Sequence, residues 1–222
     1  MMTTGHTSDP ALTLARQVLT TAIIGDILDR YRRPQQFLSP QLTPLIPSAR
    51  IAGRAMPVVM SDIDTAPQKP FGLLTEALDQ LQPDEVYLSS ATAQPLAHWG
   101  EIMTATAQQR HCVGAIVDGY YRDTSQVLAR EFPVWGVGAY GASAGSRAIV
   151  TDFRVPITCG GVTVTPGDLV VADRDGVVVV PRDIEDDVMA EAAGIAAKEN
   201  VVCREIDGGL SATAAFSTHG IL

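Results

Sequence analysis

The segment Val113–Asp118, with the sequence VGAIVD, is a nearly unbroken apolar run of strand length. A strand with one solvated face alternates between apolar and polar residues, whereas a continuously apolar strand has to be covered on both faces. Strands of this kind are typical of α/β proteins, in which further layers pack on a central sheet. The run therefore predicts an α/β fold with this strand inside the sheet.

The part of the chain before this strand shows both helical and strand periodicity. An acidic residue precedes the first helical stripe, and Gly25 is the residue at which that helix could be interrupted. The elements expected here are helices over Asp9–Tyr31, Leu73–Leu81 and Glu101–His111 and strands over Ile51–Met60 and Glu85–Ser90.

Short strands separated by turn sequences dominate the second half of the chain. Gly160-Gly161, Pro166-Gly167-Asp168 and Asp173–Gly176 are typical turn sequences. The elements expected here are strands over Phe132–Val137, Val155–Thr158, Val162–Val164, Leu169–Ala172 and Val177–Val180, and a closing helix over Asp183–Glu205.

Length and charge limit the organisation and the partners of the chain. At 222 residues, 46% of them hydrophobic, it is expected to form one domain spanning 1–222. The net charge of −9 opposes binding to nucleic acid or to anionic membranes. We also expect a cytoplasmic protein, because no membrane-spanning or signal-peptide pattern is present and the three cysteines lack metal-type spacing.

Two segments could form one binding site for a small anion. Glu101 opens a helix after Gly100, and the start of a helix leaves N–H groups unpaired with positive dipole character. Arg122 and Asp123 follow the buried strand at its carboxyl end, where ligands usually bind in α/β sheets. An arginine fork grips a carboxylate, and an aspartate oxygen suits a hard cation such as magnesium. The pair therefore fits an anionic substrate chelated to a metal.

Simpler interpretations remain open from the residues alone. Arg122 and Asp123 could be a solvated surface pair, and Glu101 could be a helix-start carboxylate that the dipole favours. His98 is interpreted as a surface or capping residue and Trp99 as a packing residue. The chain also lacks the glycine-rich nucleotide loops and the common hydrolase motifs. Residue patterns alone thus end at an α/β domain with a candidate anion site.

Five stretches of the chain resemble a known family, the RraA-like proteins, and within it the class II pyruvate aldolases that cleave 4-hydroxy-4-methyl-2-oxoglutarate and 4-carboxy-4-hydroxy-2-oxoadipate. The resemblance covers the chain from about Leu19 onward. The matching stretches are Thr21–Asp29, Ala97–Met103, Gly114–Asp123, Phe132–Trp135 and Pro166–Pro181. The resemblance implies a single-domain, layered α/β/β fold of the swivelling type.

The resemblance also implies roles for particular residues. The aldolases carry an acidic residue, twenty intervening residues and then Arg-Asp, and here Glu101 and Arg122-Asp123 fit that spacing. Glu101 stands where the family usually has the shorter aspartate. By resemblance Asp123 ligates Mg2+, Mn2+ or another divalent cation. The resemblance assigns substrate binding to Arg122 and to the backbone at Gly100, Ile102 and Met103.

The family's sites are shared between subunits, which implies a homotrimer or a homohexamer. A glutamate from the closing helix of a neighbouring subunit holds water near the metal, and Glu199 is the best positional match, with Glu205 second. The implied partner is a small 2-oxo acid, and the implied reactions are aldol cleavage and oxaloacetate decarboxylation. Both pass through the enolate of pyruvate. In aldol cleavage the resemblance implies that a metal-bound water, held by Glu101 or Glu199, acts as the base that accepts the 4-hydroxyl proton.

Two other functions are compatible with the resemblance. The family's namesake is a non-catalytic protein that binds and inhibits a ribonuclease, and it lacks the aspartate of the Arg-Asp pair. Retention of Asp123 therefore favours an enzyme here. An enzyme acting on an unrelated sugar acid is the third interpretation, because a fold alone does not fix a substrate.

Overall fold

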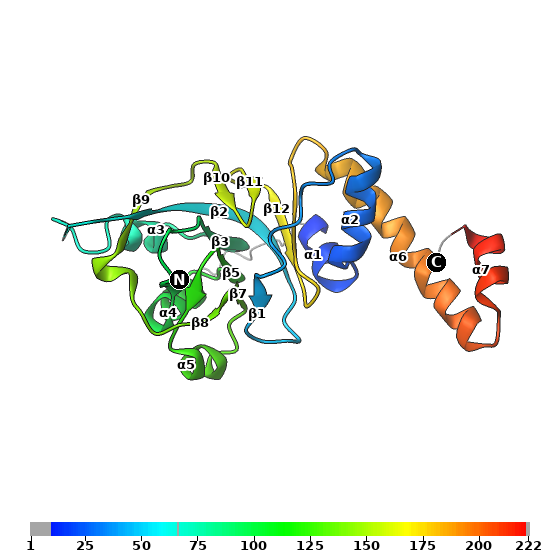
Figure 1. Ribbon diagram of the computed structural model, residues 1–222. Helices are drawn as coiled ribbons and strands as arrows, with labels where there is room; N and C mark the ends of the chain where they lie inside the picture. Colours follow the sequence, from blue (N-terminus) through cyan, green and yellow to red (C-terminus); the bar gives the residue numbers. More distant parts are fainter. Residues whose placement is uncertain (1–9, 66, 221–222) are drawn as a thin grey trace, which may run out of the picture.

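The computed structural model describes residues 10–65 and 67–220 (Figure 1). The helices are α1 (Pro10–Gln17), α2 (Thr21–Arg30), α3 (Leu74–Asp79), α4 (Glu101–Gln109), α5 (Thr124–Ala129), α6 (Glu185–Asp207) and α7 (Ala212–His219). The strands are β1 (Thr43–Pro44), β2 (Ile51–Asp62), β3 (Glu85–Ser89), β4 (Ala97–Trp99), β5 (Gly114–Val117), β6 (Tyr120–Tyr121), β7 (Val134–Gly136), β8 (Gly138–Ala139), β9 (Ala148–Phe153), β10 (Ile157–Cys159), β11 (Val162–Val164), β12 (Leu169–Ala172) and β13 (Val177–Val180).

The main sheet is built around the long strand β2. Its order is β1-β7-β5-β3-β2-β12-β13, and β9 pairs with the last part of β2 while β12 pairs with the first part. Strands β2, β3, β5 and β7 are parallel, β1, β9 and β12 pair antiparallel to them, and β13 pairs antiparallel to β12. Strand β5, the apolar run of the sequence, thus lies inside the sheet between two parallel neighbours, as expected.

Both faces of this sheet are covered, which explains the continuous apolar run. Ala115 and Val117 of β5 belong to a core cluster that includes buried residues of α3, α4 and α5. Ile116 belongs to the cluster on the opposite face, which the β10–β11 hairpin covers with Ile157 and Val164. The α/β fold is confirmed, with helices on one face of the central strands and a β-hairpin on the other.

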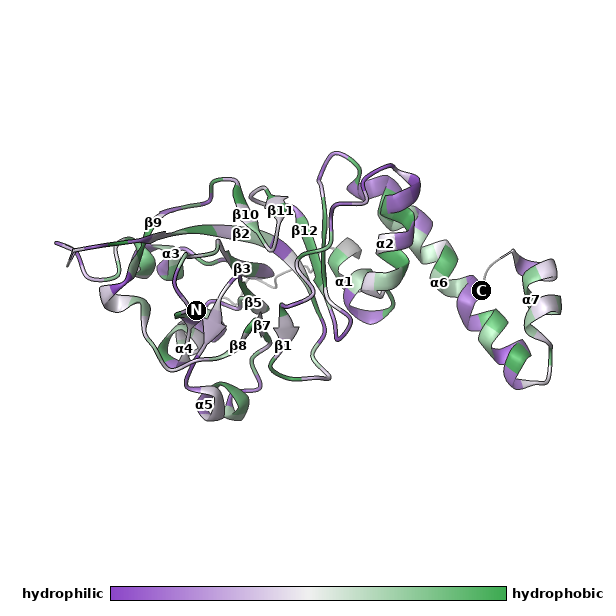
Figure 2. Cartoon of the chain, viewed as in Figure 1, coloured by the Kyte–Doolittle hydropathy of each residue, from purple (hydrophilic) through white to green (hydrophobic). Residues whose placement is uncertain are grey.

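A third cluster joins the remaining helices to the sheet. Buried residues of α1, α2 and α6 pack on Ala52 of β2 and on β12 and β13. Beyond this contact α6 extends away from the sheet toward α7 (Figure 1). In Figure 2 strand β12 is largely hydrophobic, whereas α2 and α6 carry hydrophilic and hydrophobic stretches. Within the described residues, no helix combines the length and the apolar character needed to cross a membrane.

The prediction of one helix over Asp9–Tyr31 is wrong. The chain forms α1 and α2 instead, because the Thr20 hydroxyl accepts a hydrogen bond from the Ile23 amide (3.2 Å) and begins a new helix. Gly25 does not interrupt α2. A Cβ on Gly25 would lie 2.4 Å from the Phe37 ring, so close packing explains the glycine. Asp9 lies outside the described residues.

Several short elements have no counterpart in the sequence prediction. Strands β4, β6 and β8 form a small parallel sheet, and β9, α5 and α7 were not expected either. Strands of two or three residues are too short to show periodicity. The small sheet nevertheless determines where the candidate site lies, because the site residues directly follow β4 and β6.

Candidate active site

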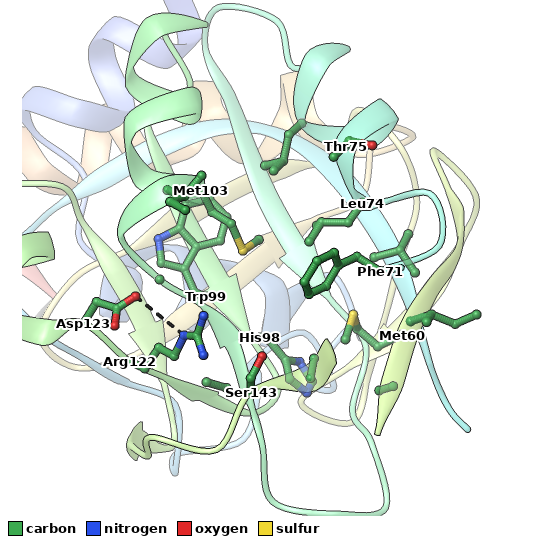
Figure 3. A pocket seen from close by; sticks show the side chains of 18 of the residues that line it. Met60, Phe71, Leu74, Thr75, His98, Trp99, Met103, Arg122, Asp123 and Ser143 are labelled. Atoms are coloured by element: carbon green, nitrogen blue, oxygen red, sulfur yellow. Dashed lines mark ion pairs between the residues drawn. The ribbon is translucent and has the colours of Figure 1, made fainter. Parts of the chain in front are cut away.

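A cleft of about 230 Å³ opens where α4 begins (Figure 3). It is lined by residues of β4, α4, the segment after β6, α3, β9 and the 3-10 turn at 144–146. All the site residues expected from the sequence except Glu199 line this one cleft, namely Gly100, Glu101, Ile102, Met103, Arg122 and Asp123.

Pairing between β4 and β6 brings the two parts of the site together. The two strands are parallel, with Trp99 opposite Tyr121, and the Arg122 amide donates to the Trp99 carbonyl (3.0 Å). Residues that follow adjacent parallel strands emerge at the same edge. Gly100 and Glu101 therefore lie against Arg122 and Asp123, although about twenty residues separate them in sequence.

The carboxylate of Asp123 is placed at the start of α4. Asp123 adopts a left-handed backbone conformation (φ 53°), and its Oδ2 accepts a hydrogen bond from the Glu101 amide (3.2 Å). The Arg122 Nε lies 3.6 Å from the same oxygen. Non-glycine residues with this backbone are uncommon and often occur at functional sites. Among the described residues no group hydrogen-bonds the other oxygen, Oδ1, and the side chain is 40% exposed, so a ligand can reach it.

Gly100 is required by this arrangement. A Cβ at this position would lie 2.7 Å from Asp123 Oδ2 and 3.4 Å from Arg122 Cγ. Neither atom can move without changing the site, because one is the carboxylate and the other carries the guanidinium. Gly100 thus lets the α4 N-terminus approach Arg122 and Asp123 closely.

We expect Gly100→Ala to lower turnover by about 100-fold, because a displacement of around 1 Å in a reacting group has an effect of that order. The measurement is kcat/KM beside the melting temperature, with Gly194→Ala as the control. A Cβ at Gly194, on α6, meets no atom within 4 Å. Near-normal turnover by Gly100→Ala would show that the position of the Asp123 carboxylate does not matter.

His98 is a buried part of the cleft wall rather than the surface or capping residue that the sequence suggested. It is 4% exposed, and its ring nitrogens contact the hydroxyls of Ser89 (2.9 Å) and Thr92 (3.0 Å). Burial lowers the pKa of His98 to about 4, so the imidazole is neutral at pH 7. With both nitrogens occupied, His98 links β4 to Ser89 of β3 and to Thr92 and is not free to transfer a proton.

Trp99 has the packing role that the sequence suggested. It is 1% exposed and stacks on Phe132, with ring centroids 5.7 Å apart. Its indole N–H donates to the Thr104 hydroxyl of α4 (2.8 Å). Trp99 thus fixes the helix that carries Glu101 to the core.

Glu199 does not meet these residues within one chain. It lies on α6, which packs on Ala52, β12 and β13 at one end of the sheet, whereas α4 and α5 pack on the central strands and α6 extends away from them (Figure 1). Glu205, the second choice, contacts His219 of α7 (2.7 Å). An acidic contribution from α6 would therefore have to come from another subunit.

The number of carboxylates in the cleft limits which metal ions the cleft could bind. Among the described residues no group of three or more His, Cys, Asp or Glu side chains could hold a metal ion, and only Asp123 and Glu101 line the cleft as carboxylates. Mg2+ typically uses one or two protein carboxylates and completes its octahedron with water and substrate oxygens. The residues present fit such a hard cation and do not fit a structural zinc site.

The apolar part of the lining was missed by sequence reasoning. Phe71 lies just before α3, Leu74 begins α3, and Val150 lies on β9. The helical stripe over Leu73–Leu81 identified buried positions but gave no sign that one end of it borders a cleft. Strand β9 was not expected at all, so this wall had no detectable signal.

Comparison with known proteins places the chain in a family. The model of the RraA-like proteins, described as Aldolase/RraA, matches residues 21–179. The chain belongs to the RraA-like family. A relative from Halalkalibacterium halodurans, named "Putative 4-hydroxy-4-methyl-2-oxoglutarate aldolase", is 28% identical over 90% of each chain. The family resemblance noted in the sequence is thereby confirmed.

Other relatives match over different lengths. Protein DlpA of Legionella pneumophila is 32% identical over 50% of this chain, a match that covers only 18% of that longer protein. The solved structure of Streptomyces coelicolor RraAS2, described as an unusual member of the RNase ES inhibitor RraA protein family, superposes with a TM-score of 0.75 and 27% identity. That match covers 87% of this chain and 96% of RraAS2. The family thus includes proteins named as aldolases and proteins named for ribonuclease inhibition.

Proposed function

We propose that this protein is a carbon-carbon lyase that cleaves small 2-oxo acids with the help of a divalent cation, as an aldolase or a decarboxylase. The supporting observation is the convergence of Arg122, Asp123 and the α4 N-terminus on one cleft. Names of relatives agree with a lyase, since several are named as aldolases of 4-hydroxy-4-methyl-2-oxoglutarate.

The α4 N-terminus and Arg122 would bind the 2-oxo acid. The amides of Ile102 and Met103 lie in the first turn of α4, where N–H groups have no acceptor within the helix. In the proposed complex these amides donate hydrogen bonds to the carboxylate of the 2-oxo acid, and the Arg122 guanidinium binds the substrate through two parallel hydrogen bonds. In this pose the 2-oxo group lies next to Asp123.

Arg122 also stabilises the charge that develops during cleavage. A magnesium or manganese ion held by Asp123 would polarise the 2-oxo oxygen. As the bond to C3 breaks, negative charge spreads from C3 to that oxygen, and the fixed guanidinium favours this enolate. Glu101 is close enough to the same cleft to orient a water that accepts a proton, and Glu199 of a neighbouring subunit is the other candidate.

A panel of 2-oxo acids tests this proposal. Oxaloacetate and 4-hydroxy-2-oxo acids are incubated with the full-length protein, with and without Mg2+, and pyruvate release is measured. We expect release that depends on the cation. If no acid releases pyruvate in a cation-dependent way, the catalytic proposal is wrong, and a ribonuclease-binding role like that named for the family of RraAS2 becomes the better hypothesis.

We further propose that the active unit is a homo-oligomer, a trimer or a hexamer, in which Glu199 serves the site of a neighbour. Asp123→Asn and Glu199→Gln would each inactivate the protein on their own. After dissociation and mixed reassembly, some interfaces combine an intact Asp123 with an intact Glu199. We expect activity to return at those interfaces, because Asp123 and Glu199 belong to different subunits and an interface with both residues intact forms a complete site.

The complementation is measured as turnover after reassembly, with each variant dissociated and reassembled alone as the control. Glu191→Gln, also on α6, is a matched substitution, because Glu191 pairs with Arg30 of its own chain (2.5 Å). If mixed oligomers are shown to form and no activity returns, Glu199 does not complete a neighbour's site.

A further inference from the structure

The cleft has two chemically different ends (Figure 3). Arg122 and Asp123 lie at one end, and Phe71, Leu74 and Met60 lie at the other (Figure 3). The second end is completed by apolar side chains of α3 and β9, namely Leu78, Ala148, Ile149 and Val150. A ligand that fills the cleft therefore passes from a charged environment into an apolar one.

Polar groups along the rest of the cleft wall already have hydrogen-bond partners. The Thr75 hydroxyl donates to Glu76 (3.0 Å), and the Ser143 hydroxyl accepts from the Gly145 amide (3.2 Å). Both ring nitrogens of His98 contact hydroxyls, as described above. The Thr75 hydroxyl and the His98 ring therefore cannot replace the water around a second ligand charge without breaking an existing contact, and the Ser143 hydroxyl could offer only one neutral donor.

Cations are also missing from the apolar end. Of the described residues that line the cleft, Arg122 carries the one positive charge. Outside the lining, Lys69 is ion-paired with Glu76, and the Arg147 guanidinium donates to the Ser143 carbonyl (3.0 Å). Among the described residues that line the cleft, a carboxylate placed against Phe71 and Leu74 would lose hydration and gain no cationic partner.

Backbone strain supports a binding role for Phe71. Phe71 has a left-handed backbone (φ 63°), which is unfavourable for a bulky residue and is often found where function requires it. Its carbonyl accepts from the Val150 amide (3.1 Å), which fixes the strained turn to β9. The next residue, Gly72, also has a positive φ, and a Cβ there would lie 2.1 Å from the Val150 carbonyl oxygen. Phe71 itself stays 43% exposed.

We propose that the substrate carries an uncharged alkyl or aryl group at C4 of the 2-oxo acid, and that the apolar end binds this group. The proposal rests on the proposed function, which places the 2-oxo acid at Arg122. A carboxylate at C4 is disfavoured there. The apolar end thus selects among 4-hydroxy-2-oxo acids according to the charge of the group at C4.

Cleavage of such a substrate balances without an oxidant or a reductant. The C3–C4 bond breaks and its electron pair stays on C3 as the enolate of pyruvate. The 4-hydroxyl proton passes to the base, and C4 becomes the carbonyl carbon of an uncharged ketone or aldehyde. The enolate then takes a proton at C3, which gives pyruvate.

Two uncleavable ligands test the selectivity directly. 4-Methyl-2-oxopentanoate and 2-oxoglutarate share the 2-oxo acid end and are similar in size, but one ends in an isopropyl group and the other in a carboxylate. Their dissociation constants are measured by titration calorimetry on the full-length protein with Mg2+, beside that of pyruvate. We expect the dissociation constant of 4-methyl-2-oxopentanoate to be about tenfold or more below that of 2-oxoglutarate. A difference of this size is the effect of burying two to three carbon groups.

The two proposals fail in different ways. If pyruvate binds but 2-oxoglutarate binds as well as or better than the isopropyl compound, only the apolar selectivity is wrong, and Arg147 becomes the candidate partner of the second carboxylate. If pyruvate itself does not bind, the proposed function is wrong and the selectivity with it.

Introducing a cation at the apolar end should change the preference. In Leu74→Arg, we expect the ratio of the dissociation constants of the two ligands to change by about tenfold in favour of 2-oxoglutarate, because the new guanidinium can form one charge-assisted contact with its second carboxylate. Leu128→Arg is the matched control, because Leu128 is 44% exposed on α5 outside the cleft lining. Phe71→Arg provides a second variant if a lowered melting temperature shows that Leu74→Arg does not fold. An unchanged ratio in a folded variant of either kind would overturn the assignment.

Discussion

Asp123→Asn is expected to lower turnover by about 1000-fold, the largest effect among the substitutions considered, comparable with losing a principal electrostatic contact at an active site. The amide keeps the shape of the side chain but loses the charge that we propose holds a hard cation. Its oxygen can still accept the hydrogen bond from the Glu101 amide, which in the native protein is 3.2 Å from Asp123 Oδ2. The fold should therefore survive the loss of activity.

Turnover, Mg2+ affinity and melting temperature are measured together for this variant. Asp175→Asn is the control, since Asp175 is exposed in the turn between β12 and β13, outside the cleft. We expect the melting temperatures of both variants to stay close to that of the native protein. Normal turnover by folded Asp123→Asn would falsify the role of Asp123 as metal ligand.

Arg122→Lys is expected to lower kcat/KM by about 100-fold, because an ammonium group cannot reproduce the planar two-point grip of a guanidinium. Arg122 packs beside Gly100 and lies 3.6 Å from the Asp123 carboxylate, so the lysine keeps a positive charge in the same region. A lower kcat/KM in Arg122→Lys would therefore show that the planar geometry of the guanidinium matters, and not only its positive charge.

The same measurement should include inhibition by pyruvate, which we expect to weaken together with catalysis. Arg174→Lys is the control, because Arg174 is exposed in the turn after β12 and does not line the cleft. If Arg122→Lys keeps both near-normal turnover and near-normal inhibition by pyruvate, Arg122 does not contact the substrate.

The parts of the fold that the sequence predicted best have a strong local pattern. Val162–Val164, Leu169–Ala172 and Val177–Val180 were predicted with the bounds that the structure shows, because turn residues separate them. The break at Thr20 was missed, since the apolar stripe continues through Leu19, which is fully buried. The tertiary contacts of Thr21 with Asp173 (2.8 and 2.9 Å), which the sequence pattern does not reveal, help to anchor the start of the second helix.

The polar half of the site was predictable for a similar reason. Helix starts and strand ends have local signatures, so Glu101 and Arg122-Asp123 could be identified along the chain and joined by the family resemblance. Their contact depends on β4 and β6, which are two to three residues long and have no periodicity of their own. Gly100 acquires its meaning only when the Asp123 carboxylate is seen 2.7 Å from its missing Cβ.

The apolar half of the site could not be predicted because it depends on long-range pairing. Strand β9 lies along the end of β2, some ninety residues away in sequence, and it fixes the strained turn at Phe71. Sequence periodicity carries no information about a left-handed phenylalanine, which is an exception to backbone preference rather than a consequence of it. The substrate selectivity that we propose accordingly depends on contacts that only the folded chain brings together.

Exchange of the C3 protons of pyruvate with deuterium tests the central claim most directly. Both proposed reactions pass through the same enolate, so a lyase of this kind should form it from pyruvate alone, whatever the rest of the natural substrate is. Exchange is followed by proton NMR in deuterium oxide with the full-length protein, with and without Mg2+. We expect Mg2+-dependent exchange by the native protein, strongly reduced in Asp123→Asn. Absence of exchange by folded native protein that binds both Mg2+ and pyruvate would contradict the account.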